Sequence, residues 1–261
     1  WQDIVSGLGW GLGYFGMPHI LVRFMSIEKP SMIKKSSIVA IVWVIISLFS
    51  AVLIAYFGRM VMGAELLTQG NQKLVFIAMA RKFFPAGICG LLLAAIIAAS
   101  ISTADSQLLV ASSSFTADLY KPFFRKNASE KETLMVGRIL VLILSLIAFG
   151  IANSKGSGAQ AIMDMVENAW GAFGASFGPT ILLSLFWKRF NYQGAVAGVI
   201  SGFVVDLGWL LTGMTDATGI FEIIPGFFAS LLIAVVVANL TAEPNEKAVE
   251  IFEQGIKAET E

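Results

Sequence analysis

Charged residues and cysteine are both scarce in this sequence. Only 14% of the 261 residues are charged, against roughly 25% in an ordinary soluble domain. The single cysteine, Cys89, excludes an internal disulfide framework and a cysteine metal cluster, and we interpret it as a small apolar helix residue. Because the 18 basic and 18 acidic side chains cancel, no overall field favours nucleic acid as a partner.

Signatures of soluble enzyme chemistry are also missing. The sequence contains no Walker loop, dinucleotide fingerprint, zinc-site spacing or kinase signature, so an ATP-driven pump has no support in this chain. An intramembrane enzyme would need paired catalytic residues at depth, whereas only isolated acids and one histidine, His19, are visible. Trp1 leads straight into apolar sequence without a basic segment or a cleavage site. We therefore interpret the chain as a piece of a longer protein and not as one that starts with a signal peptide.

Apolar residues make up 56% of the chain, with 20 Phe and 25 Gly. A membrane-spanning helix needs about 20 mostly apolar residues, and glycine is more common in such helices than in soluble ones. We therefore predict an all-α integral membrane protein, embedded in lipid, with about seven transmembrane helices. The stretches that qualify are roughly 4–25, 38–62, 86–114, 134–153, 162–187, 194–212 and 222–240.

One connection is longer than the others, from Gly63 to Pro85. Within it, Leu74, Ile77 and Arg81 recur at helical spacing, which predicts a short amphipathic helix lying on one membrane face. The polar tail from Ala242 onwards is expected to be helical or loose.

Lys and Arg predict the orientation of these spans, because they are enriched in cytoplasmic connections. One alternating set of connections holds most of them: Arg23, Lys29, Lys34, Lys35, Lys121, Arg125, Lys126, Lys131, Arg138, Lys188, Arg189, Lys247 and Lys257. The other set holds only Arg59, Lys73, Arg81, Lys82 and Lys155. The first span should therefore run from outside to inside, and the tail should be cytoplasmic.

The first candidate site is the segment Gly7–His19, in which five glycines and a proline interrupt one apolar stretch. Each glycine weakens a helix interior by about 1 kcal/mol and proline by about 3 kcal/mol, so the helix should be broken there. Trp10, Tyr14 and Pro18 lie four residues apart and share one face, which suggests a pocket for a small amphipathic solute. Close helix packing through the glycines is the alternative. His19 could bind substrate, carry a proton or bond to a helix-end carbonyl.

The second candidate site follows the apolar run that ends at Ala98. Ala99, Ser102, Thr103 and Ser106 fall on one helical stripe and could offer oxygens to a hard cation such as sodium. Asp105 adds a carboxylate within the span, or lies in water towards its cytoplasmic end. The alternative is a packing face whose hydroxyls bond back to helix carbonyls.

Two further features have weaker interpretations. Asp206 lies in the sixth stretch and could face a bundle interior, but the sequence assigns it no role. The run Gly171–Pro179 is rich in small residues and predicts tight packing against neighbouring helices in preference to gating.

Several separate motifs together resemble the sodium:solute symporter family, most closely its proline-transporting members. They occur in the right order and cover nearly the whole chain: Trp10–Ile20, Arg23–Met25, Ser102–Leu109, Asp118–Lys121, Trp170–Ala175 and Glu222–Phe227.

The resemblance implies a leucine-transporter-like fold of two inverted five-helix repeats with additional helices outside them. Residues 1–187 would be the second repeat, 188–240 two additional transmembrane helices, and 241–261 the cytoplasmic tail of a multi-pass plasma-membrane protein. The missing N-terminal repeat of the same transporter would then be this chain's main partner and would supply the rest of the site. An interrupted helix at the start of a repeat is what such folds use at their binding site.

The resemblance also implies roles for named residues in importing L-proline with sodium. Trp10, Tyr14, Pro18 and His19 would line the proline site. The carbonyl of Ala99 and the hydroxyls of Ser102 and Thr103 would bind Na+, and Asp105 and Ser106 correspond to an additional sodium site of some relatives. Pantothenate, another carboxylate or a sugar remains an alternative substrate, and a transporter-like membrane sensor is an alternative of a different class.

Overall fold

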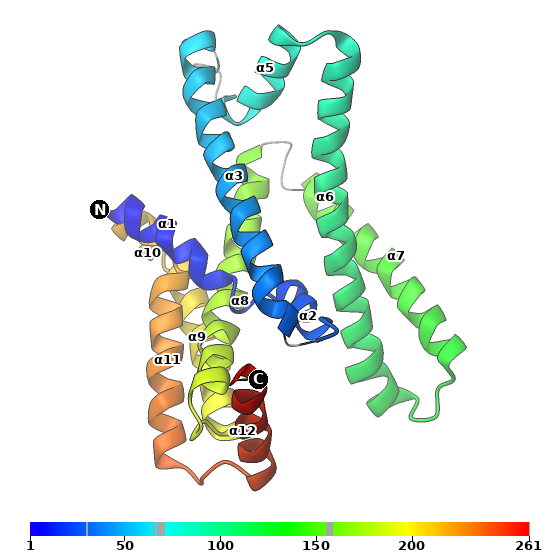
Figure 1. The fold of residues 1–261 in the computed structure, drawn as a ribbon, viewed down its shortest axis with the longest axis vertical. Coiled ribbons are helices and arrows are strands. Elements are labelled where there is room, and N and C mark those ends of the chain that lie inside the picture. The colour runs from blue at the N-terminus through cyan, green and yellow to red at the C-terminus, as the bar shows by residue number, and fades with distance from the viewer. Residues whose placement is uncertain (30, 65, 67–70, 155–158, 261) are drawn as a thin grey trace. The chain divides into compact units, whose positions relative to one another are not determined.

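The computed structural model describes residues 1–29, 31–64, 66, 71–154 and 159–260, and the regular structure of these residues is helical (Figure 1). The helices, in chain order, are α1 (Gln2–Gly13), α2 (Pro18–Met25), α3 (Ser31–Met62), the short η1 (Gln72–Leu74), α5 (Val75–Phe83), α6 (Ala86–Ser114), η2 (Phe115–Phe124), α7 (Glu130–Ser154), α8 (Ala159–Phe186), α9 (Tyr192–Leu211), α10 (Met214–Thr218), α11 (Ile223–Leu240) and α12 (Glu246–Thr260).

Six helices of the described residues are long and apolar enough to cross a membrane. They are α3, α6 with its continuation η2, α7, α8, α9 and α11, and they match six of the seven predicted stretches. The predicted stretch 4–25 consists instead of α1, with 12 residues, and α2, with 8 residues. Neither helix reaches the roughly 20 residues of a span. The predicted interruption is thus confirmed, while a seventh crossing by the broken pair stays a prediction.

The chain forms two compact units, which we describe separately. Residues 1–31 and 160–261 make up the first unit, and residues 32–159 make up the second. These units are groups of residues that contact one another. The predicted boundaries at residues 187 and 240 instead mark the ends of the expected repeat and of the additional helices, so the two units do not test them.

Helices α8, α9 and α11 of the first unit lie side by side (Figure 1), and small residues line their contacts. A methyl group on Gly198 would come within 2.9 Å of the Ala234 side chain, and one on Gly226 within 2.7 Å of the Ala175 side chain. Ala175 and Ala234 have no exposed surface. The predicted packing role of the small-residue run in α8 is therefore confirmed, since a larger residue at these crossings would separate the helices.

Asn191 joins the start of α9 to the end of α11. Its Oδ1 accepts from the backbone N–H of Gly194 at 2.9 Å, which caps α9. Its Nδ2 donates to the carbonyls of Ala238 at 3.2 Å and Ala242 at 2.6 Å. One buried side chain thus provides hydrogen-bond partners for backbone groups at the start of α9 and at the end of α11.

The start of α1 is tied to the connection between α10 and α11. Gln2 Nε2 donates to the carbonyl of Thr218 at 2.6 Å, and Ser6 Oγ donates to the carbonyl of Gly219 at 2.9 Å. Ser6 Oγ also accepts from the backbone N–H of Phe221 at 3.2 Å. These bonds join residues more than 200 positions apart, so the first helix is held by the C-terminal part of the chain.

In the second unit, α6 continues through η2 into a turn that leads to α7. Tyr120 donates through its hydroxyl to Glu132 Oε1 at 2.9 Å, and Arg125 Nε lies 3.1 Å from the same oxygen. These contacts hold the two long helices together at this end.

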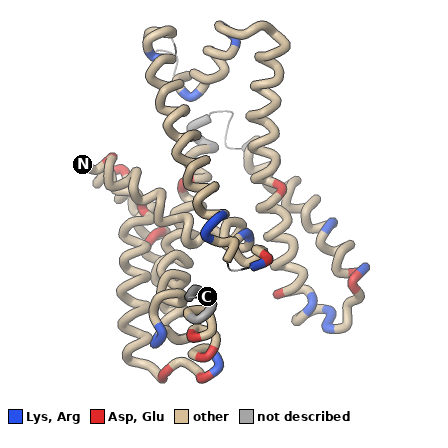
Figure 2. The backbone as a smooth tube through the Cα atoms, in the orientation of Figure 1, with Lys and Arg blue, Asp and Glu red and all other residues tan. Residues whose placement is uncertain are grey.

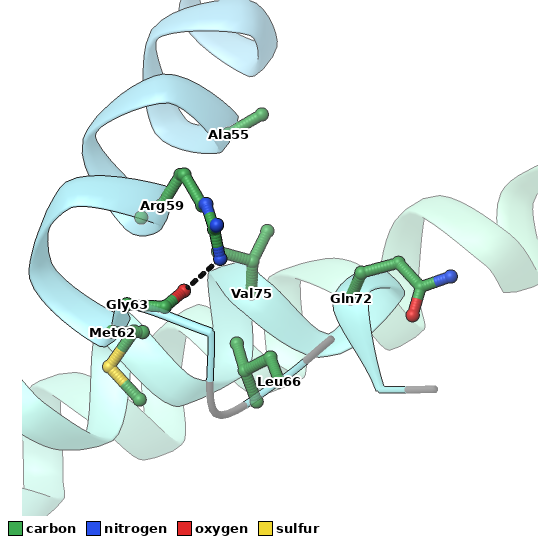
Figure 3. A pocket seen from close by; sticks show the side chains of 8 residues that line it. Ala55, Arg59, Met62, Gly63, Leu66, Gln72 and Val75 are labelled. Carbon is green, nitrogen blue, oxygen red and sulfur yellow. Dashed lines mark hydrogen bonds between the residues drawn. The ribbon is translucent and has the colours of Figure 1, made fainter. Parts of the chain in front are cut away.

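The predicted amphipathic helix in the long connection is present as α5. Beside it, a cavity of about 140 Å³ lies between the end of α3 and the residues Leu66, Gln72 and Val75 (Figure 3). Arg59 lines this cavity and donates to the carbonyl of Gly63 at 2.7 Å. The cavity contains none of the residues predicted to bind substrate or sodium.

Most basic residues of the second unit lie near helix ends, where the tube of Figure 2 is blue. Lys34 and Lys35 lie near the start of α3, and Arg59 lies in its last turn. This distribution fits helices whose apolar middles lie in lipid, although the direction of crossing stays a prediction. Lys155 lies outside the described residues, and the tail beyond Asn245 forms the helix α12.

Candidate functional site

The interruption between α1 and α2 falls at residues 14–17. The backbone N–H of Gly16 donates to the carbonyl of Gly13 at 3.0 Å, so α1 ends in a tight turn. Met17 is extended, with φ −80° and ψ 116°, and Pro18 occupies the first turn of α2. Proline is suited to that position because its missing N–H would have no partner within the helix. At the start of α2, the N–H groups of Ile20 and Leu21 donate to the Met17 carbonyl at 3.0 and 3.1 Å, so the N–H of His19 is left outside these bonds.

Four aromatic side chains form a cluster beside this break, which we call the aromatic cluster: Trp10, Tyr14, Trp170 and Phe221. The ring centroids of Trp10 and Trp170 are 5.6 Å apart, and those of Trp10 and Phe221 are 5.7 Å apart. Tyr14 meets Trp170 edge-on at 4.9 Å. Such pairs add about 0.5–1.5 kcal/mol each beyond the area they bury. Because 58% of the Tyr14 side chain is exposed, the cluster presents one open side.

Trp170 connects α8 to the broken helix. Its indole Nε1 donates to the carbonyl of Trp10 at 3.0 Å, and any side chain on Gly13 would overlap the indole ring. Sequence reasoning placed Trp170 in a family motif but not in the candidate site. The available signal was its position directly before the small-residue run Gly171–Pro179, where helices can approach closely.

The other two predicted substrate residues, Pro18 and His19, lie half-buried at the start of α2. Within the described part of the chain, no ring contact or hydrogen bond joins them to the aromatic cluster. The structure thus brings Trp10 and Tyr14 together around Trp170, and places Pro18 and His19 on the far side of the break.

The glycines of α1 and the break fall into two groups. Gly9, Gly13 and Gly16 face α8 and α11 so closely that a methyl group on any of them would collide with a neighbour. Gly7 and Gly11 have no neighbouring atom within 4 Å of such a methyl group. The packing interpretation is therefore correct for the first group, while the second group forms an open face of the helix.

The predicted sodium ligands lie together on one exposed stretch of α6, in the second unit. The carbonyl oxygen of Ala99 accepts from Ser102 Oγ at 2.9 Å and from Thr103 Oγ1 at 3.3 Å. The three oxygens proposed for one ion therefore converge on one point of the helix surface. In this arrangement the hydroxyls bond back to a helix carbonyl, as the packing alternative expects. If both hydroxyl hydrogens turned away, the Ala99 carbonyl oxygen could bind a cation together with the two hydroxyl oxygens.

The second, less specific pair lies one turn further along the same helix. Ser106 Oγ donates to the carbonyl of Ser102 at 2.8 Å, and Asp105 is exposed. Among the described residues, no group of three or more His, Cys, Asp or Glu side chains could hold a metal ion.

The sequence of the chain matches known transporters over nearly its whole length. It is 41% identical over 250 residues to the osmoregulated proline transporter OpuE of Bacillus subtilis (strain 168), covering 96% of this chain and 50% of that protein. It is 43% identical over 249 residues to the high-affinity proline transporter PutP of the same strain, covering 95% of this chain and 52% of that protein. A sodium/proline symporter of Haemophilus influenzae is 40% identical over 262 residues, covering 98% of this chain and 51% of that protein.

The chain thus spans about half the length of the curated relatives it matches. A family model described as the sodium:solute symporter family matches residues 2–202. This is a family of multi-pass membrane transporters and not of enzymes, in agreement with the helices long enough to span a membrane. The chain belongs to the sodium:solute symporter family.

Proposed function

We propose that this chain is part of a sodium-coupled symporter that imports L-proline by alternating access. The observation that carries the proposal is the identity of about 40% with three proteins whose names describe proline transport, over nearly the whole chain. The aromatic cluster beside the broken helix is chemically suited to the same substrate, because proline combines an apolar ring with a carboxylate and an ammonium group.

The proposed fold is leucine-transporter-like. Helices α1–α8 would form the second five-helix repeat, with the broken pair α1 and α2 as its first crossing, and α9 and α11 would be the two additional helices. The excess of Lys and Arg in one set of connections supports a cytoplasmic tail at the plasma membrane. The other half of the transporter, which the relatives' greater length implies, would complete both binding sites.

In the proposed substrate site, the proline ring packs against Trp10 and Tyr14 on the open side of the aromatic cluster. Backbone groups at the break, together with Pro18 and His19 at the start of α2, would bind the charged ends of the substrate. Amides at the start of a helix carry partial positive charge and favour a carboxylate. Trp170 would position Trp10 through its hydrogen bond to the Trp10 carbonyl.

In the proposed sodium site, the Ala99 carbonyl and the hydroxyls of Ser102 and Thr103 supply three oxygens from α6. Hard cations take about six oxygen ligands, so the other half of the transporter would supply the remainder. Asp105 and Ser106 are proposed, with less support, for an additional sodium ion. Sodium is transported here as a second substrate and is not a resident cofactor.

No covalent chemistry is needed in this mechanism, because the sodium gradient supplies the driving force. Each charge that crosses is worth about 2.3 kcal/mol per 100 mV. Coupling requires that sodium and proline stabilise the same conformation more together than separately, so sodium must raise the affinity for proline and proline the affinity for sodium.

The experiment is uptake of labelled proline into vesicles that contain the full-length protein, with sodium or with choline outside. We expect uptake that depends on sodium and is competed by unlabelled proline. Uptake that ignores both sodium and excess unlabelled proline would exclude the proposal. Competition by pantothenate, other carboxylates or sugars in place of proline would support a different substrate of the same family.

A membrane sensor built on the same fold is the alternative of a different class. It predicts proline binding without net uptake, and a signalling domain in the full-length sequence. Binding by calorimetry combined with the uptake assay separates the two functions.

A further inference from the structure

Two acidic side chains are buried in the first unit, apart from the proposed transport sites. Asp206 lies in α9 with 1% of its surface exposed, and Glu222, the residue before α11, has 2% exposed. Buried carboxyl groups are expensive unless they are paired or neutral. Their presence here therefore requires an explanation.

Both carboxyl groups face Gly171 of α8. A methyl group built on Gly171 would lie 3.0 Å from Asp206 Oδ1 and 3.6 Å from Glu222 Oε1. The two oxygens thus border the same small space, which exists because residue 171 has no side chain. Three helices meet at this point, since α8 contributes the glycine, α9 contributes Asp206, and Glu222 directly precedes α11.

The two carboxyl groups differ in their hydrogen bonds. Glu222 Oε2 accepts from the hydroxyl of Thr215 at 2.9 Å, and the group also lies at the N-terminus of α11, where negative charge is favourable. Asp206 Oδ1 is fully buried and has no hydrogen-bond partner in the described structure. These surroundings therefore favour the ionised form of Glu222 and the protonated form of Asp206.

Helices α1, α8, α9, α10 and α11, which surround the pair, offer no positive side chain. Their sequences contain no Lys, Arg or His. Their other titratable groups are the carboxyl groups of Asp3 of α1, Asp164 and Glu167 of α8 and Asp216 of α10, and the phenol of Tyr192 of α9. Two ionised carboxylates beside one another in this position would have no positive charge to compensate them, which is strongly unfavourable for buried ions.

We infer that Asp206 and Glu222 together bind one proton, with the Asp206 acid donating to the Glu222 carboxylate across the space above Gly171. A metal ion fits less well, because hard cations take about six oxygen ligands. The side chains around this space offer the carboxyl groups of Asp206 and Glu222 and the hydroxyl of Thr215, and that hydroxyl already donates to Glu222. Loss of the proton would place two like charges between α8, α9 and α11 and loosen their packing.

Infrared spectroscopy of the full-length protein in detergent tests this inference directly, because a protonated carboxyl group has a C=O stretch distinct from that of a carboxylate. Spectra are recorded near neutral pH, in sodium chloride and in choline chloride, for the wild type and for the Asp206→Asn, Glu222→Gln and Asp216→Asn variants. Asp216 is exposed and serves as the matched control. Asparagine imitates a protonated aspartate, so the Asp206→Asn variant should fold, and size-exclusion chromatography checks this.

We expect a carboxylic-acid band in the wild type and in Asp216→Asn that is lost in Asp206→Asn. It should shift or disappear in Glu222→Gln, because the acceptor of the proton changes. An unchanged band in Asp206→Asn, or no band in the wild type, would overturn the proton site. A Glu222→Gln spectrum identical to the wild type would overturn the pairing. A wild-type band present only when choline replaces sodium would show that a metal ion occupies the site instead.

Discussion

The indole nitrogen of Trp170 donates a hydrogen bond to the backbone carbonyl of Trp10 at 3.0 Å, across 160 residues of sequence. This bond joins α8 to the last turns of α1, immediately before the helix breaks. The aromatic cluster therefore depends on a contact that removes one backbone carbonyl from the set available to a ligand.

The variant Trp170→Phe tests this positioning, because it keeps an aromatic ring and deletes the bond. A neutral hydrogen bond contributes about 0.5–1.5 kcal/mol, so we expect the proline concentration for half-maximal uptake to rise about two- to tenfold. Trp209→Phe is the matched control, since the Trp209 indole makes a similar bond to the carbonyl of Ile220 at 3.2 Å outside the cluster. Equal effects of the two variants on proline affinity would contradict the positioning role.

The variant Gly13→Ala tests the close packing of α1, because its methyl group would overlap the Trp170 ring. Overpacking costs about 1–3 kcal/mol, so the thermal unfolding temperature should fall and proline uptake should weaken. Gly7→Ala is the control in the same helix, since no atom lies within 4 Å of its added methyl group. We expect Gly7→Ala to be tolerated, and a loss of stability similar to that of Gly13→Ala would show that the open face is occupied.

The variant Thr103→Ala tests the proposed sodium site. Loss of an oxygen that binds an ion costs about 1.5–3 kcal/mol, so the sodium concentration for half-maximal uptake should rise about ten- to hundredfold, with little change in folding. Ser100→Ala is the control on the same helix, because its hydroxyl bonds to the carbonyl of Ile96 at 3.1 Å, apart from the Ala99 carbonyl. Sodium dependence equal to the wild type in Thr103→Ala would remove Thr103 from the site.

The variant Tyr14→Ala tests the open side of the aromatic cluster. Because 58% of Tyr14 is exposed, its removal should cost little stability. Loss of an aromatic contact of about 0.5–1.5 kcal/mol should raise the proline concentration for half-maximal uptake about two- to tenfold. Tyr56→Ala, at a tyrosine that is 62% exposed on α3, controls for loss of a surface ring. Unaltered proline kinetics in Tyr14→Ala would count against a pocket role.

Local sequence was sufficient to predict the long apolar helices and the break around Tyr14. Hydropathy over about 20 residues, and the cost of glycine and proline in a helix, act within one segment. Which glycines of α1 pack against a neighbouring helix and which lie on its open face could not be predicted in this way. Gly13 packs and Gly11 does not because of where α8 and α11 lie, and nothing within α1 encodes those positions.

The same limit applies to the buried residues. Asp206 stood out in the sequence as an acid within a span, but its relationship to Glu222 depends on how α9 and α11 pack over Gly171. Glu222 was the first residue of the last predicted stretch, and the sequence assigned it no role. Its burial follows from the short helix α10 and the turn after it, and neither can be predicted from a periodic pattern of apolar residues.

The bonds from Gln2 and Ser6 to residues 218–221 limit how the broken helix can move. With its first turns anchored to the C-terminal helices, α1 cannot tilt or slide by itself without breaking these bonds. The break that follows is held as well, because Gly16 packs against the backbone of α8. A rearrangement of α1 would therefore have to carry the connection between α10 and α11 with it, or break these bonds.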